Sequence, residues 1–154
     1  MSKADAAVKN MKLLIPTIEA KAFTFKIPMP GHSCSEKVLE DEFQNLQKLE
    51  NLVEEYDIVF NVLDSREARY FPTLFSGIYN KLCISVGLGY DNFVIVKHGY
   101  RNFKELLVAN TPKDTCFEDD FGCFFCNDYL SPKNTMANRT LDQQCTGKFK
   151  IFIF

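Results

Sequence analysis

Hydrophobic and polar positions along this chain follow helical periods in two stretches. Residues 3–14 carry apolar side chains at helical spacing and Pro16 follows them, which predicts a helix that ends before the proline. A longer helix is predicted over 36–56, where charged residues surround one apolar stripe. The stripe comprises Val38, Leu39, Phe43, Leu46, Leu49, Leu52 and Val53. Both segments are therefore expected to pack one face and to leave the other in water.

Shorter apolar runs between and after these helices predict strands. Residues 58–63 and 82–86 are almost continuously apolar, a pattern typical of strands buried on both faces of a parallel sheet. Residues 92–97 predict another strand, and the loosely alternating stretch 18–27 predicts one more. A helix over 65–80 connects the two buried runs. Strands that alternate with helices in this way indicate an α/β domain.

Length and composition fit one domain. A chain of 154 residues with 46% apolar residues can bury a real core. The net charge is −2 and no basic block occurs, which argues against a nucleic-acid-binding surface. No apolar run approaches the roughly 20 residues that span a bilayer, and the polar N-terminus lacks a signal-peptide core. Six cysteines without dense regular spacing indicate reduced thiols in a cytoplasmic protein.

Polar residues with possible chemistry stand at the ends of predicted strands. Asp64 directly follows the buried run 58–63, and ligands of open α/β sheets bind at the carboxyl ends of strands. Ser65 is a candidate helix cap, and Asp64 with Arg69 could equally form a local ion pair. His98 stands at another strand end, where a hydrogen-bonded structural role is favoured over a ligand. Gly87-Leu88-Gly89 is too short for a phosphate loop and predicts a turn.

The stretch 122–146 holds three of the six cysteines. Cys123 and Cys126 form a C-x-x-C pair, which has the spacing of half a structural zinc site. A thioredoxin-like redox pair is the alternative, but it requires a helix start that the aromatic interior of the motif does not supply. Cys145 stands alone on a polar segment, where a substrate can reach a thiol. It is therefore a candidate nucleophile, and a surface thiol without a function is the other interpretation.

Four blocks of the sequence, in the same order, resemble the ubiquitin-like-modifier-activating enzymes of autophagy. They are DIVFNVLDSREARYFPTL, VGLGYDNFVIVKHG, GCFFCND and RTLDQQCT. The resemblance covers about residues 2–146 and implies an incomplete doubly wound, Rossmann-like α/β fold of the ThiF/MoeB type. Its sheet is expected to be mostly parallel, with flanking helices. No G-x-G-x-x-G occurs in the sequence, so the first glycine-rich βαβ unit of the family is expected to be absent.

The resemblance implies roles for three residues near the nucleotide. Lys3 matches a family lysine that contacts the phosphates of ATP, and Asp64 matches the aspartate that holds Mg²⁺ and ATP. Arg69 matches the arginine of the same D-x-x-x-x-R block. The chemistry is suitable because magnesium prefers carboxylate and phosphate oxygens. The residues alone leave two other interpretations open: Lys3 is a solvated surface lysine, and Asp64 and Arg69 form a local ion pair.

The resemblance also implies the chemistry of the cysteines. The family joins the C-terminal glycine of a ubiquitin-like modifier to AMP, and Cys145 would then hold the modifier as a thioester for transfer to conjugating enzymes. Cys123 and Cys126 match zinc ligands whose second cysteine pair is not in this sequence. The family is homodimeric, and the isolated chain is expected to be inactive. A truncated binding module, or a small zinc or redox C-x-x-C domain, is the alternative, whereas the missing fingerprint disfavours a nicotinamide-dependent oxidoreductase.

This interpretation divides the chain into four parts. Residues 1–99 form a partial adenylation domain, 100–121 a linker or insert, 122–146 the half zinc site with the catalytic-cysteine segment, and 147–154 an atypical tail. The tail, GKFKIFIF, is apolar, β-prone and expected to have no partner. Without the central strands of a doubly wound sheet, the strand predicted at 18–27 is expected to pair in parallel with 58–63, because unpaired backbone is costly.

Overall fold

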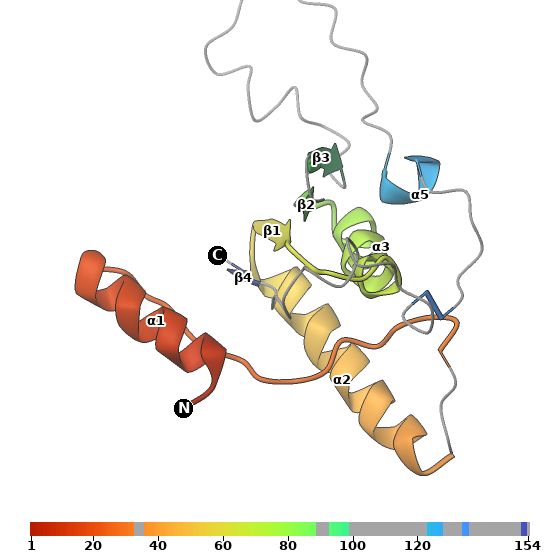
Figure 1. The fold of residues 1–154 in the computed structure, drawn as a ribbon, viewed down its shortest axis with the longest axis horizontal. Helices are drawn as coiled ribbons and strands as arrows, with labels where there is room; N and C mark the ends of the chain where they lie inside the picture. Colours follow the sequence, from red (N-terminus) through yellow and green to blue (C-terminus); the bar gives the residue numbers. More distant parts are fainter. Residues whose placement is uncertain (33–35, 89–92, 99–122, 128–133, 136–151, 154) are drawn as a thin grey trace, which may run out of the picture.

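The computed structural model of the chain describes residues 1–32, 36–88, 93–98, 123–127, 134–135 and 152–153. Its helices are α1 (Lys3–Leu14), α2 (Glu36–Glu55), the 3₁₀ helix η1 (Glu67–Arg69), α3 (Tyr70–Ile78) and α5 (Phe124–Asn127). Its strands are β1 (Ile58–Asn61), β2 (Leu82–Leu88), β3 (Phe93–His98) and β4 (Phe152–Ile153). Figure 1 shows the strands at the centre of the fold, next to α2 and α3, with α1 set apart. The predicted linker 100–121 and Cys145 lie outside the described residues.

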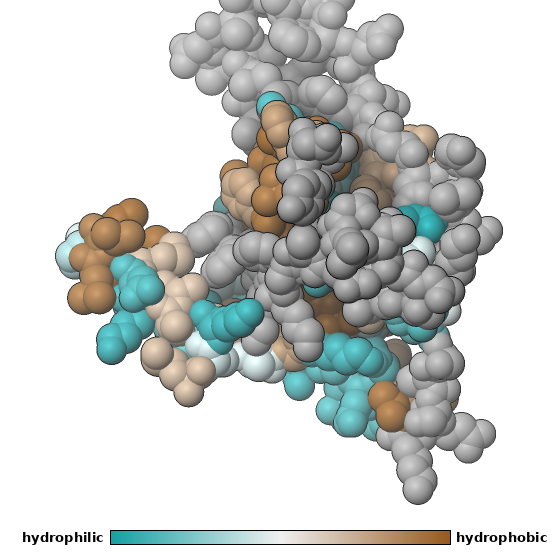
Figure 2. Space-filling model, viewed as in Figure 1, coloured by the Kyte–Doolittle hydropathy of each residue, from teal (hydrophilic) through white to brown (hydrophobic). Residues whose placement is uncertain are grey.

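Helix α1 has the predicted bounds, and its own N-terminal cap stabilises it. Ser2 Oγ accepts a hydrogen bond from the Asp5 backbone N–H at 3.1 Å, and the Ser2 N–H donates to Asp5 Oδ2 at 3.1 Å. No residue of α1 is buried. Leu13 and Leu14 are exposed near its C-terminus, where Figure 2 shows a hydrophobic end. No helix in the described part of the chain is long and apolar enough to cross a membrane.

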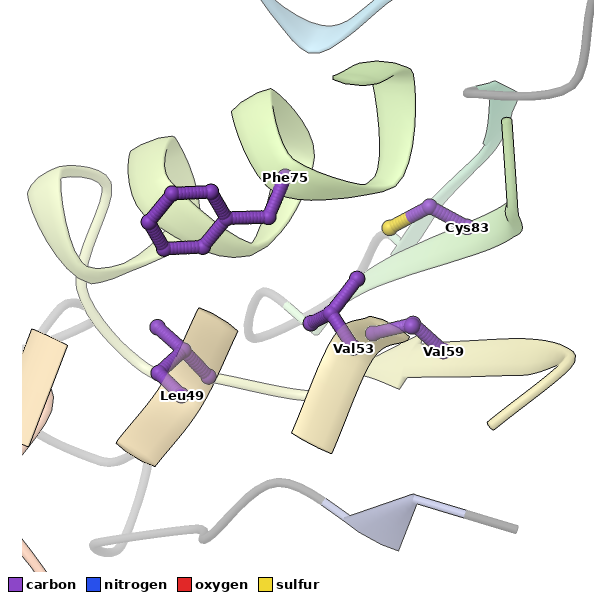
Figure 3. Packing of buried hydrophobic residues seen from close by; sticks show 5 residues of the cluster. All are labelled: Leu49, Val53, Val59, Phe75 and Cys83. Carbon is purple, nitrogen blue, oxygen red and sulfur yellow. The ribbon is translucent and has the colours of Figure 1, made fainter. Parts of the chain in front are cut away.

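One hydrophobic core joins α2 and α3 to the sheet. Leu49, Val53, Val59, Phe75 and Cys83 point toward one another between these elements (Figure 3) and are almost fully buried. Helix α2 packs with the C-terminal half of its apolar stripe, whereas the N-terminal half of the stripe is exposed. The exposed members are Val38, Leu39 and Phe43. Both helices therefore cover the face of the sheet to which Val59 and Cys83 point.

The sheet has the strand order β3-β2-β1-β4 and is mixed. Strands β1 and β2 are parallel, with Ile58 opposite Leu82, and α3 lies between them in sequence, so they form the βαβ unit that the buried runs predicted. Strand β3 is antiparallel to β2 because a connection from Leu88 to Phe93 is too short for a parallel crossover. The expectation of a mostly parallel sheet is therefore wrong for the described strands, since one of their three pairings is parallel.

The C-terminal tail has a partner, contrary to expectation. Strand β4 pairs antiparallel with β1, with Ile153 opposite Val59 and Phe152 opposite Phe60. An apolar, β-prone segment satisfies its backbone by adding to an open sheet edge, and β1 offers such an edge. Strand β4 therefore completes one side of the described sheet.

Residues 18–27 form no strand, and the predicted pairing with 58–63 is wrong. The segment runs along α2 instead: Lys26 Nζ lies 2.7 Å from Glu42 Oε1, and Lys21 Nζ lies 4.0 Å from Glu55 Oε1. From Lys21 to Lys26 the extended chain advances five residues, or about 17 Å, and from Glu42 to Glu55 the helix advances thirteen residues, or about 20 Å. The two lysines are therefore spaced to match the two glutamates. Phe25 and Ile27 pack against the core. Side chains, rather than a strand ladder, therefore hold this segment.

Candidate functional site

Asp64 lies at the carboxyl end of the parallel strand pair, as predicted. Strand β1 ends at Asn61, Leu63 is buried, and Asp64 is half-buried immediately after it. Because β1 and β2 are parallel, their carboxyl ends meet at one edge of the sheet, where α/β folds bind ligands. The βαβ unit therefore presents a carboxylate at the edge where a bound nucleotide or metal would lie.

Arg69 is folded back onto the same strand end. The residue is 9% exposed, and its guanidinium donates a hydrogen bond from Nη2 to the Leu63 carbonyl oxygen. Burial lowers the pKa of this guanidinium below its usual value, and the negative charge of Asp64 opposes that shift. Arg69 thus makes a local contact with the strand end through the Leu63 carbonyl, while its ion pair with Asp64 stays a prediction. Its contact with a nucleotide stays a prediction.

Gly87 makes room for the Val94 side chain and lies next to the Arg69 guanidinium. A Cβ atom at Gly87 would lie 2.9 Å from Val94 Cγ1 and 3.4 Å from Arg69 Nη2. The turn predicted at Gly87-Leu88-Gly89 is wrong for its first two residues, since Gly87 and Leu88 lie within β2. A glycine inside a strand allows another group to approach the backbone closely, and here that group is the Val94 side chain, directly opposite on β3.

We expect Gly87→Ala to destabilise the fold by about 1–3 kcal/mol, because the added methyl overpacks against Val94. Gly77→Ala is the matched control. A Cβ atom at Gly77 meets nothing within 4 Å, so alanine inside α3 should stabilise the fold by about 0.5–1 kcal/mol. Denaturant unfolding of both variants measures the difference. Equal stability of the two variants would show that the space above Gly87 is not needed.

A buried row of polar side chains crosses the three strands β1, β2 and β3. Asn61 Nδ2 donates to the Arg69 carbonyl oxygen at 3.3 Å and to Ser85 Oγ at 3.2 Å. Ser85 Oγ in turn shares a hydrogen bond of 2.9 Å with His98 Nε2. The structural role predicted for His98 is confirmed, and burial lowers its pKa to about 4. The sequence analysis missed Asn61 and Ser85, whose only signal is a polar residue inside an apolar run.

The buried imidazole predicts a loss of stability in mild acid. The pKa of His98 is about 4 in the fold and near 6.5 in the unfolded chain, so below pH 6.5 the unfolded chain binds more protons. The contribution of neutral His98 to the free energy of unfolding is therefore fully present above about pH 6.5 and is lost progressively as the pH falls toward 4. We expect the native chain to lose about 2 kcal/mol more than His98→Gln between pH 7 and pH 5. Denaturant unfolding at both pH values tests this, and equal losses would contradict it.

The turn after β1 contains residues that the sequence analysis misjudged. Ser65 is not a helix cap, because η1 begins at Glu67 without a side-chain cap and Ser65 Oγ instead donates to Met29 Sδ at 3.4 Å. Glu67 is fully buried, although its charged neighbours in the sequence suggest a surface residue. Sequence reasoning offered no signal for this burial, because the groups that cover Glu67 come from distant parts of the chain.

The C-x-x-C pair lies on a single helical turn that packs on α3. Cys123 Sγ and Cys126 Sγ are 3.5 Å apart, and both residues are thiols. Two thiolates on one tetrahedral zinc ion lie about 3.8 Å apart, given zinc–sulfur bonds of about 2.3 Å, so the pair fits half of such a site. Contrary to expectation, the aromatic interior of the motif forms the helix α5, and its rings lie 5.2 and 5.9 Å from the Tyr70 ring. The described residues contain no cluster of three or more metal-binding side chains.

The structure does not bring Lys3 to the strand end. Lys3 is exposed in the first turn of α1, and α1 stands apart from the sheet (Figure 1). Cys145 lies outside the described residues, so its predicted role is not addressed by the geometry. Of the predicted site residues, the fold therefore places Asp64 and Arg69 together and Cys123 and Cys126 together.

These features place the chain among α/β domains in which a parallel βαβ unit carries a carboxylate at the carboxyl end of its strands. The chain belongs to the ThiF family, whose profile matches residues 1–149.

Several curated relatives share one name over almost the whole chain. It is 39% identical over 146 residues to the ubiquitin-like modifier-activating enzyme atg7 of Dictyostelium discoideum, a match that covers 94% of this chain and 21% of the relative. The enzyme of the same name from Komagataella pastoris is 35% identical over 144 residues, with the same two shares. The Homo sapiens enzyme is 36% identical over 161 residues, covering 94% of this chain and 23% of the relative. The chain thus spans about a fifth of the length of these relatives.

Proposed function

We propose that this chain is part of an enzyme that uses ATP to activate the ubiquitin-like modifiers of autophagy. The carrying observation is the similarity of 94% of the chain to modifier-activating enzymes, together with Asp64 at the carboxyl end of the βαβ unit. Because the chain spans about a fifth of those relatives, the activity belongs to a longer polypeptide. The isolated chain is then inactive, and the doubly wound sheet with its glycine-rich unit is supplied by the longer protein.

The first step of the proposed reaction is adenylation. The C-terminal carboxylate of the modifier attacks the α-phosphorus of ATP, pyrophosphate leaves, and a modifier acyl-adenylate forms. The Asp64 carboxylate suits Mg²⁺, which would neutralise the phosphate charge when bound. Arg69 holds the strand end that presents Asp64. Lys3 would contact the phosphates only if α1 moved, and α1 has no buried residue to oppose such movement.

The second step is thioester formation. The Cys145 thiolate attacks the acyl carbon of the adenylate, AMP leaves, and the modifier is held as a thioester until a conjugating enzyme accepts it. An acyl-adenylate is a good electrophile, so the thiol needs little activation. Lys148, Lys150 and Arg139 are the nearest cations in the sequence, whereas Asp142 has the wrong charge to favour a thiolate. A homodimeric, cytoplasmic enzyme is part of the same proposal.

Zinc is proposed for the C-x-x-C pair. With two further thiolates from the longer protein, Cys123 and Cys126 would complete a tetrahedral structural site that anchors α5. We expect Cys123→Ser to remove bound zinc from the complete protein, measured by elemental analysis. Cys83→Ser is the control, because burial raises the pKa of Cys83 to about 11 and makes it a poor thiolate ligand. Unchanged zinc in Cys123→Ser would contradict the assignment.

The proposed function is tested by ATP–pyrophosphate exchange with the complete protein. A ubiquitin-like modifier of autophagy with a free C-terminal glycine should support exchange of labelled pyrophosphate into ATP. The same modifier without that glycine should not, because the attacking carboxylate is then misplaced. Exchange that is absent with both modifiers, or equal with both, would contradict the proposed function.

A further inference from the structure

Three segments that are far apart in the sequence meet at the turn formed by residues 65–70, immediately after Asp64. Met29 and His32, from the connection between α1 and α2, contact Ser65 and Glu67. The ring of Tyr70 contacts the two phenylalanine rings of α5. Thr135 contacts Glu67 from the segment that leads to Cys145. The turn therefore joins the strand end to both cysteine-bearing parts of the chain.

Glu67 is the centre of this junction. Its side chain is completely buried, and Thr135 Oγ1 donates a hydrogen bond of 2.7 Å to Glu67 Oε2. His32 Nε2 lies 4.0 Å from the same oxygen. Glu67 Oε1 and His32 Nε2 have no hydrogen-bond partner among the described residues. A buried carboxylate is costly unless it is hydrogen-bonded, so the hydroxyl of Thr135 matters more here than at a solvated site.

We infer that Glu67 is a positioning residue that fastens the catalytic-cysteine segment to the strand end that carries Asp64. Glu67 is three residues after Asp64, and Thr135 is ten residues before Cys145. The contact between them spans 68 residues of sequence, so it is a tertiary constraint rather than a local turn. Because Cys145 is ten residues after Thr135, fixing Thr135 limits how far from the strand end Cys145 can lie. The inference rests on the proposed function, because it concerns delivery of the thiol to the adenylate.

A constraint of this kind affects the second chemical step more than the first. Adenylation uses groups at the strand end, whose geometry the Leu63 carbonyl and Arg69 maintain without Thr135. Thioester formation requires the thiol to reach the acyl carbon, and holding reactants together lowers the entropic part of that barrier. Loss of the hydrogen bond between Thr135 and Glu67 should therefore slow thioester formation and leave the rate of adenylation unchanged.

The test measures both half-reactions of the complete protein, with the modifier that supports exchange. Thr135→Val removes the hydroxyl at nearly constant shape, and we expect thioester formation to slow about tenfold while pyrophosphate exchange is unchanged. Thr135→Ser, which keeps a hydroxyl, should restore the rate. Thr73→Val is the control for a buried threonine whose hydroxyl has no hydrogen-bond partner among the described residues, and it should change neither rate.

The outcomes are distinguishable. An unchanged thioester rate in Thr135→Val would overturn the inference. Parallel loss of exchange and thioester formation would also overturn it, since the contact would then only stabilise the fold. Exchange without any thioester on Cys145 in the unsubstituted protein would instead refute the assigned nucleophile and, with it, the positioning role.

Discussion

Asp64→Asn is expected to lower modifier-dependent pyrophosphate exchange by about a hundredfold or more. Asparagine keeps the shape of the side chain at the carboxyl end of β1 but removes the negative charge that suits Mg²⁺ and its bound phosphates. Removing one group that stabilises charge in a transition state costs about 10²–10³ in rate. The substitution also removes the neighbouring charge that opposes the effect of burial on Arg69. Exchange should be measured over a range of Mg²⁺ and ATP concentrations.

Asp57→Asn is the matched control for this substitution. Asp57 is exposed at the amino end of the same strand, where the fold presents no ligand-binding edge. We expect it to leave the exchange rate within about twofold of the unsubstituted protein, because exposed substitutions away from a site have small effects. Equal activity of both variants would show that the carboxyl end of β1 does not hold the nucleotide.

Cys145→Ser is expected to abolish the thiol-sensitive conjugate while exchange continues. The hydroxyl is a far weaker nucleophile than a thiolate at neutral pH, so the second step should slow by about a thousandfold or more. Slow reaction would trap the modifier as an oxygen ester that resists thiol reductants. Non-reducing and reducing gels of the complete protein with ATP and modifier distinguish the two linkages.

Cys116→Ser serves as the control for loss of a cysteine. Cys116 also lies in a polar part of the sequence, but it matches none of the four blocks. Its replacement should leave thioester formation unchanged. A normal thioester in the Cys145→Ser variant would contradict Cys145 as the nucleophile. Loss of the thioester only in the Cys116→Ser variant would contradict it as well.

The elements with strong local signals could be predicted from the sequence. Helices α1 and α2 follow from regular apolar spacing and, for α1, from Pro16 after its end. The buried runs became β1 and β2 in a parallel pair. Local periodicity specifies such elements because the same residues that set the period also form the buried face.

The errors concern pairings between distant segments. Residues 18–27 have strand-like alternation, but the edge of β1 is taken by β4 and the segment follows α2 through Lys21 and Lys26. Strand β3 is antiparallel because its connection to β2 is short. The resemblance to a parallel fold led instead to the expectation of a mostly parallel sheet. Which strand occupies which edge depends on competition across the whole fold, and a local pattern does not contain that information.

The candidate site shows the same division. Asp64 was found because a strand end is recognisable from the sequence. Gly87 and Ser85 acquire their roles only through contacts across strands, where the glycine makes room for Val94 and the serine hydroxyl joins Asn61 to His98. A polar residue in an apolar run is visible in sequence, but its partner is not.

The most direct test of the proposed function is mass spectrometry of the complete protein after incubation with ATP and a ubiquitin-like modifier of autophagy. The account predicts an ATP-dependent adduct of one modifier, lost on treatment with a thiol and mapped by peptide analysis to Cys145. An adduct on another residue would contradict the assigned nucleophile. No adduct in the presence of ATP, Mg²⁺ and an intact modifier would contradict modifier activation itself.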